Sequence, residues 1–360
     1  MKKISLFLAI TLCVSLLAGC AGTPVVYYSD CTCPTGSNEE AAPVETQATV
    51  PAAEGALKTG LYISTGIGDS KSASGEEAGE GKYDVTMVAV LVDDDGIIRD
   101  CIIDGISASV SFDATGTITS DLTAAPQTKT ELGEAYGMVA YGGAIAEWDE
   151  QVAALASFAV GKTVEELKSG AIDETGRAPE GTDLASSATI YLGGYVSDIE
   201  AAVANAQHLG AQSGDVLKLA SINGIDGSAS AGEKDGFTQL DATVTALTMN
   251  GETITSCAID SVQAKVSFDT TGTITSDLTA PVQTKNELGE AYGMVAWGGA
   301  TAEWNEQAAS FASYVTGKTL AEVSGIAVNE RTVPTDADLA SSVTIAIGGF
   351  QALIAKAAQG

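Results

Sequence analysis

Histidine is almost absent from this chain of 360 residues, which contains a single one, His208. Serine and cysteine nucleophiles generally need a histidine as base, and many zinc sites use histidine ligands. His208 lies in a short linker between two repeated regions described below. The sequence therefore excludes a histidine-dependent hydrolase or a histidine-based zinc site within either region.

Basic residues are also scarce. The chain has 17 Lys and Arg against 47 Asp and Glu, which gives a formal net charge of −30. A nucleic-acid partner needs positive charge to neutralise its phosphates, so we expect no nucleic acid to bind. The acidic excess favours solubility and says nothing about the fold.

Cysteine is too rare for a disulfide framework in so long a chain. The six cysteines are Cys13, Cys20, Cys31, Cys33, Cys101 and Cys257. Neither a histidine nor a third cysteine stands near the Cys31-Thr-Cys33 pair, so we interpret it as incidental or redox-labile. Cys101 and Cys257 occupy equivalent places in the two repeats, and the sequence assigns them no role.

The first twenty residues contain an apolar run, Ile4 to Leu17, that is short for a membrane span. Lys2 and Lys3 precede the run, and Leu-Ala-Gly-Cys ends it at Cys20. This arrangement resembles the lipobox of bacterial lipoproteins, which implies cleavage before Cys20 and acylation of its thiol. The predicted protein is extracytoplasmic and anchored in the lipid bilayer through Cys20. An ordinary signal peptide or an N-terminal helix is the alternative.

The rest of the chain divides into a tether and a tandem duplication. Residues 21–56 are rich in Ala, Pro, Thr and Glu and predict a flexible tether. Beyond them, TGTITSDLTA occurs at 115–124 and 271–280, and ELGEAYGMVA at 131–140 and 287–296. This period, near 155 residues, is the size of a domain and not of a solenoid repeat. We predict two similar domains, 57–206 and 216–360, joined by a linker at 207–215.

The patterning within each copy predicts the α+β class, with a small antiparallel sheet packed against helices. Two β-rich runs flank Asp-Gly in the first copy and Asn-Gly in the second, which favours hairpins. We expect a third strand at ASVSF or AKVSF, a helix within 144–160 and its counterpart, and a final helix after each Gly-Gly. Thr163 and Thr319 each begin a capping-box pattern, which predicts another short helix.

One short motif occurs in both copies, as DLASSAT at 183–189 and DLASSVT at 338–344. If the residues from Ser187 to Leu192 form a strand, Ala188, Ile190 and Leu192 share its apolar face and Thr189 points away from that face. An enzyme that modifies hydroxyl groups could then reach Thr189, and equally Thr344. A plain turn or helix cap explains the same residues as well.

The motif resembles the covalent flavin-attachment sequence of the FMN-binding domain family, Asp-x-x-Ser-Gly-Ala-Thr. In that family a flavin transferase joins FMN to the last residue through a phosphoester. The resemblance implies covalent FMN on Thr189 and Thr344, within sites formed by the residues Asp183, Ser186, Asp338 and Ser341. Ser187 and Ser342 replace the family's Gly, and Val343 replaces its Ala.

The chain as a whole is similar to flavin-bearing lipoproteins of the PplA type, which serve extracellular electron transfer in Gram-positive bacteria. The shared features are the lipobox, the tether and the repeated motifs TKxELGEAYGM, EW(D/N)EQ and GKT. That resemblance implies an electron carrier, not a self-contained enzyme. Its implied partners are a flavin transferase, a membrane dehydrogenase linked to the quinone pool, and external electron acceptors. The alternative is a ligand-binding or structural surface lipoprotein without a redox cofactor.

Other residues have more than one reading. Asp93-Asp94-Asp95-Gly96 could suggest calcium but fits a hairpin turn better. Trp148 and Trp304 fit the core face of a helix, whereas Tyr141 and Trp297, beside glycines, are candidates for stacking on a flavin ring. Lys129 and Lys285 could offset phosphate charge, although simple surface solvation also fits the sequence.

Overall fold

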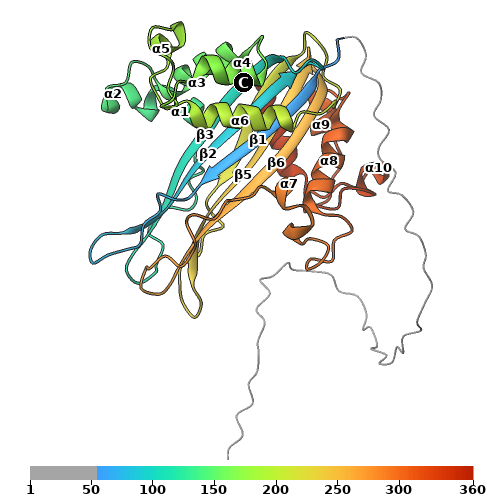
Figure 1. Cartoon of the computed structure of the whole chain (residues 1–360). Helices are drawn as coiled ribbons and strands as arrows, with labels where there is room; N and C mark the ends of the chain where they lie inside the picture. The colour runs from blue at the N-terminus through green and yellow to red at the C-terminus, as the bar shows by residue number, and fades with distance from the viewer. Residues whose placement is uncertain (1–54, 360) are drawn as a thin grey trace, which may run out of the picture. The chain divides into compact units, whose positions relative to one another are not determined.

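The computed structural model describes residues 55–359, so the predicted signal, Cys20 and most of the predicted tether lie outside the described residues. Each half of the described chain forms an antiparallel three-stranded sheet followed by short helices (Figure 1). The strands of the first half are β1 (Lys58–Gly66), β2 (Gly79–Val92) and β3 (Ile98–Phe112). Those of the second half are β4 (Val216–Gly224), β5 (Gly236–Asn250) and β6 (Thr253–Phe268). The predicted α+β class is confirmed.

The predicted hairpins are present in both sheets. β2 pairs with β3 across the Asp93–Gly96 turn, where the Asp93 carboxylate accepts hydrogen bonds from the N–H groups of Asp95 and Ile97. β5 pairs with β6 across Gly251. The residues 93–95 therefore form a turn, and among residues 55–359 no group of three or more His, Cys, Asp or Glu is placed to hold a metal ion.

The strand prediction was wrong in two respects. The residues 108–112 and 264–268 are not separate third strands, because they continue β3 and β6 without a break. The third strand of each sheet is instead β1 or β4, which precedes the hairpin and pairs with β2 or β5 along nine residues. The sequence analysis overlooked both of these strands.

The helices agree better with the predictions, since their signals are local. Thr163 and Thr319 cap α4 and α9 through the predicted capping boxes, and a helix follows each Gly-Gly. The first-half helices are α1 (Lys129–Leu132), η1 (Gly133–Tyr136), α2 (Met138–Gly142), α3 (Trp148–Ala159), α4 (Val164–Ala171), α5 (Asp183–Ser187) and α6 (Gly193–Ala204). The second-half helices are α7 (Lys285–Leu288), η2 (Gly289–Tyr292), α8 (Trp304–Val315), α9 (Leu320–Ser324), α10 (Ala337–Ala340) and α11 (Gly348–Gln359). Within residues 55–359 no helix is long and apolar enough to span a bilayer.

The two sheets share one core. In β2, Tyr83, Val85 and Met87 pack in a cluster with side chains of β5 and β6, whereas Val88 and Val90 on the other face pack against the helices of their own half. The second sheet is covered in the same way by α8 and α11. Both faces of each sheet are therefore buried, and the described residues 55–359 belong to one compact unit. In Figure 1 the helices of the two halves lie on the outer sides of the paired sheets.

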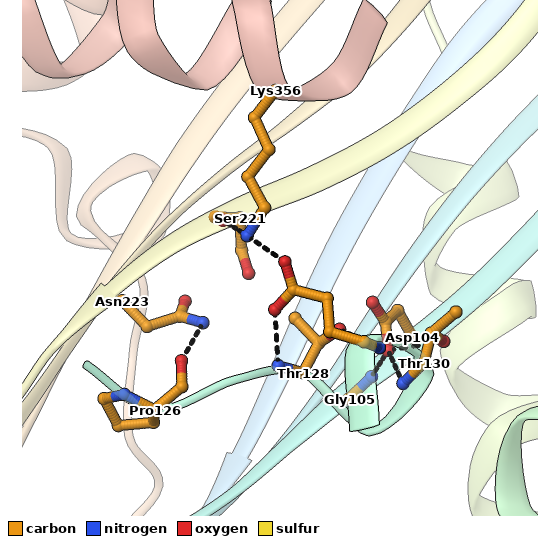
Figure 2. A network of polar contacts seen from close by, with 9 residues as sticks. Asp104, Gly105, Pro126, Thr128, Thr130, Ser221, Asn223 and Lys356 are labelled. Atoms are coloured by element: carbon orange, nitrogen blue, oxygen red, sulfur yellow. Dashed lines mark hydrogen bonds and ion pairs between the residues drawn. The ribbon is translucent and has the colours of Figure 1, made fainter. Parts of the chain in front are cut away.

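Polar contacts also join the two halves. The Lys356 ammonium, on α11, donates to the backbone oxygen of Ser221 and forms an ion pair with Glu131 of the first half (Figure 2). The Asn223 side chain donates to the backbone oxygen of Pro126 at 3.0 Å. The predicted linker is paired as well, because Leu57 donates to the backbone oxygen of Ala211. These contacts supplement the apolar interface between the sheets.

Candidate functional site

The first motif forms no strand, and the alternative of a turn or helix cap describes it better. Asp183–Ser187 is a short helix, α5, whose N-cap Thr182 accepts a hydrogen bond from the Ala185 N–H. The chain then continues in irregular conformation to α6. The alternation of burial is nevertheless the predicted one, since Ala188 and Leu192 are buried and Thr189 is exposed. The Thr189 side chain therefore faces solvent, although not from a sheet.

The second motif repeats this geometry. α10 begins after Asp336, whose carboxylate accepts from the N–H of Asp338. Val343 and Ile347 are fully buried and Thr344 is exposed. Val343, which stands where the first motif has Ala188, thus adds apolar volume to the core and leaves the threonine at the surface.

A buried glutamine holds each threonine. The Gln151 side-chain oxygen, on α3, accepts from the Thr189 N–H at 2.8 Å and from the Thr189 hydroxyl at 3.3 Å. Gln307, on α8, accepts from the Thr344 N–H at 2.8 Å and from its hydroxyl at 3.1 Å. Both glutamines are completely buried. The same polar anchor has therefore been kept in both halves.

The remaining motif residues shape the short helix. The Ser186 hydroxyl donates to the backbone oxygen of Asp183 at 2.6 Å, and Ser341 does the same to Asp338 at 2.7 Å. All four residues are exposed. Their shared role in this structure is to fix the turn of backbone that precedes each threonine.

Arg177 contacts the backbone of the first threonine. Its guanidinium donates to the backbone oxygen of Thr189. The corresponding position in the second half is Val333, as shown by the matching turns Asp173–Arg177 and Asn329–Val333. A positive charge therefore lies beside the first hydroxyl in a chain that is strongly acidic overall.

The tryptophan and lysine predictions have mixed outcomes. Trp148 and Trp304 are buried in the helical cores, as expected. Lys129 is also buried, and its ammonium lies 4.8 Å from the centre of the Trp148 ring. Burial lowers the pKa of Lys129, although Asp84 and Asp104 oppose this. Surface solvation is therefore wrong for Lys129, which acts as a cation–π partner within its own half.

Tyr141 and Trp297 are, by contrast, among the most exposed large side chains. They retain 92% and 89% of their accessible surface. The backbone around each is held by a buried glutamate: Glu147 accepts from the N–H groups of Met138 and Val139 at 2.8 and 3.0 Å. Glu303 makes the equivalent bonds in the second half. The exposure expected for these two aromatics is confirmed.

The roles of Gln151, Gln307 and Arg177 were not predicted from the sequence. The glutamines close the EW(D/N)EQ motif, which occurs in both halves, so their repetition was the available signal. Arg177 carried no such signal, because its counterpart is Val333.

Cys101 and Cys257 are free, buried thiols. Burial raises the pKa of each thiol to about 12, which makes them structural.

A surface cavity of about 810 Å³ lies away from both motifs, at the β2–β3 turn and the residues 213–215. The charged residues that line this cavity are mostly acidic. They include Asp93, Asp94, Asp100 and Asp215, together with Arg99. Asp94 there forms an ion pair with Lys58 and lies 3.0 Å from Nε2 of His208, so the single histidine is a hydrogen-bond partner of this aspartate. Comparison of the chain with protein-family models, with curated proteins and with solved structures gave no match.

Proposed function

We propose that this chain is a lipid-anchored flavoprotein that carries FMN on Thr189 and Thr344 and relays electrons outside the cytoplasmic membrane. Its donor would be a membrane dehydrogenase linked to the quinone pool, and its acceptors would be external. The supporting observation is that both threonines of the flavin-attachment motif are exposed and are held in the same way by a buried glutamine. Two exposed threonines in one duplicated setting suit a modifying enzyme.

The attachment step requires little of this chain. The threonine Oγ1 forms a bond to the phosphorus of a flavin phosphoanhydride supplied with the flavin transferase. The anhydride P–O bond breaks, a nucleotide leaves, and the hydroxyl proton is released. The backbone bonds to Gln151 and Gln307 hold the acceptor threonine in place during this step.

The residues present fit a phosphate-linked group. Each threonine is exposed, and Arg177 places a guanidinium next to Thr189, where it can pair with a phosphodiester oxygen. When bound, the flavin supplies one- and two-electron redox chemistry, which is a property of the cofactor. The chain's own contributions are to hold the attachment residue and to keep it at the surface.

The first prediction concerns flavin stoichiometry. Thr189→Ala and Thr344→Ala should each remove one FMN per chain, and the double variant should carry none. The fold should persist, because neither side chain is buried. Intact mass spectrometry of protein purified from its native membrane gives the count, and peptide mapping gives the position.

Thr335→Ala is the matched control, since Thr335 is exposed but lies outside the motif. An unchanged flavin count in the double variant would refute the assignment of these sites. Native protein without any covalent flavin would favour a ligand-binding or structural surface lipoprotein instead.

A further inference from the structure

Each half exposes an uncharged segment around a single aromatic ring. The first platform segment is residues 137–146, GMVAYGGAIA, and the second is residues 293–302, GMVAWGGATA. Neither contains an Asp, Glu, Lys or Arg, although the whole chain has a formal net charge of −30. Most of each segment is exposed, including Val139 and Val295 at 46% and 45%. Such a surface is suited to a flat, largely apolar ligand.

The backbone presents each ring to solvent. Gly137 and Gly293 both have φ of +82°, and the edge of the aromatic ring four residues later lies against each glycine. A Cβ on Gly137 would lie 2.5 Å from Tyr141 Cδ2, and one on Gly293 would lie 2.3 Å from Trp297 Cδ1. One ring edge therefore contacts the glycine. The large exposed fraction of each side chain leaves the ring faces open to solvent.

The glutamine that holds each threonine also holds the end of the platform segment. Gln151 accepts from Thr189 and donates through its side-chain nitrogen to the backbone oxygen of Ala146 at 2.9 Å. Gln307 joins Thr344 to Ala302 in the same way, at 2.8 Å. One buried side chain thus connects the attachment residue to the aromatic segment in both halves.

We infer that Tyr141 and Trp297 are stacking platforms for the isoalloxazine ring of the flavin attached in the same half. This inference depends on the proposed function and adds residues that the attachment motif does not include. Aromatic rings prefer offset, parallel contact with other π systems, and a ring whose faces are open to solvent can make such contact. The phosphoester holds one end of the flavin, and the platform holds the other.

The aromatic residue differs between the two halves. Trp297 offers a larger π surface than Tyr141. The two flavins of one chain should therefore differ in environment despite the duplicated fold.

The test uses chains that carry one flavin each. In a Thr189→Ala background, Trp297→Ala should keep one flavin per chain by mass, raise flavin fluorescence at least twofold, and reduce the visible circular dichroism of the flavin. Emission rises because an indole stacked on a flavin quenches it. Trp297→Phe should retain the circular dichroism, since a planar ring remains. In a Thr344→Ala background, Tyr141→Ala and Tyr141→Phe should behave in the same way.

Val216→Ala is the control, because Val216 is an exposed apolar residue on β4, outside both platform segments. If Trp297→Ala and Tyr141→Ala left flavin emission and circular dichroism unchanged, the stacking inference would be overturned. The flavin count in the same variants would still uphold the proposed function. Loss of flavin from Thr344 in Trp297→Ala would also overturn it, since the ring would then serve attachment. Altered self-association or vesicle binding without a change in emission would assign the platform to a second copy or to lipid. Absence of flavin from the unsubstituted chain would overturn both proposals.

Discussion

At the scale of single residues, the two glutamines are the most constrained groups of the candidate site. Gln151 accepts from the N–H groups of both Thr189 and Ile190 and donates to Ala146. A buried amide with its oxygen and nitrogen both bonded fixes three backbone positions at once. Such a group acts through the threonine and not on the flavin, so we regard it as a positioning residue.

Gln151→Leu should lower the free energy of unfolding by about 1–3 kcal/mol, because it leaves buried backbone groups without partners. It should also reduce flavin attachment at Thr189 severalfold while Thr344 remains fully modified. Urea unfolding measures the first effect, and peptide mass spectrometry measures the second.

Gln307→Leu is the matched variant and should reverse the selectivity, with Thr344 losing its flavin. Equal loss at both threonines in either variant would show that the glutamine serves general stability alone. Full attachment at Thr189 in Gln151→Leu would contradict a positioning role.

The exposure of both threonines could be predicted from the sequence, because each threonine directly follows an apolar residue that packs into the core. This alternation of buried and exposed residues holds although the segment is not a strand. The glutamines could not be assigned a role in the same way. A glutamine in a helix is ordinarily a surface residue, and only tertiary packing of α3 against the motif buries Gln151. Long-range hydrogen bonds of this kind leave no local pattern.

At the scale of elements, a carboxylate on the sheet of each half anchors the short helix that follows. Asp104, on β3, accepts from the N–H of Thr130, and Asp260, on β6, accepts from the N–H of Asn286 (Figure 2 shows the first). Burial raises the pKa of Asp260 to about 6, against the opposing effect of hydrogen bonds from Thr284, Ser261 and Asn286. The pKa of Asp104 is raised for the same reason.

This shift gives a stability effect with a definite sign. The folded Asp260 binds its proton more tightly than the unfolded residue, whose pKa is about 3.9. Stability from this group is therefore lost as pH rises from about 4 to about 6. Asp260→Asn should raise the free energy of unfolding by about 1–3 kcal/mol at pH 8 and change it little at pH 4. Urea unfolding at both pH values tests this.

Asp277 provides the contrasting variant. Hydrogen bonds from Thr279 lower its pKa. Asp277→Asn should therefore reduce stability at pH 8, opposite in sign to Asp260→Asn. If Asp260→Asn were destabilising at pH 8 as well, the buried carboxylate would be favourable when charged and the assignment of its pKa would be incorrect.

Local signals account for the elements that were predicted correctly. Asp-Gly and Asn-Gly turns and threonine capping boxes depend on residues within four positions of one another. β1 was not predicted because its buried residues face two different cores. Leu61 and Ile63, for example, pack with the other half. The strand therefore lacks the simple alternation of apolar and polar residues that marks a half-exposed strand. Ser107 and Ser109 interrupt the apolar pattern of β3, which made one long strand look like two.

At the scale of the whole molecule, the shared core couples the two halves. The Phe112 and Phe268 rings stack at 3.9 Å with their planes 6° apart, and the Tyr83 hydroxyl lies 2.6 Å from the Thr238 hydroxyl. Tyr83 and Phe268 are fully buried at this interface. Either half alone would expose the apolar face of its sheet. The two flavin sites proposed here are therefore parts of one body, on the outer helical layers of the paired sheets.

Gly81 gives the sharpest test of this coupling, because it lies where the sheets approach most closely. A Cβ at Gly81 would lie 1.9 Å from the Thr238 Oγ1 of the other half. Gly81→Ala should therefore push the sheets apart and lower the free energy of unfolding by about 1–3 kcal/mol. Gly232→Ala, where a Cβ meets open space, should leave stability nearly unchanged. Trp148 lies in the first half and Trp304 in the second. Because the core is shared, the fluorescence of either tryptophan, followed alone, should report one unfolding transition of Gly81→Ala, shifted to lower stability. Two separate transitions, with only the first half destabilised, would contradict the shared core as the source of stability.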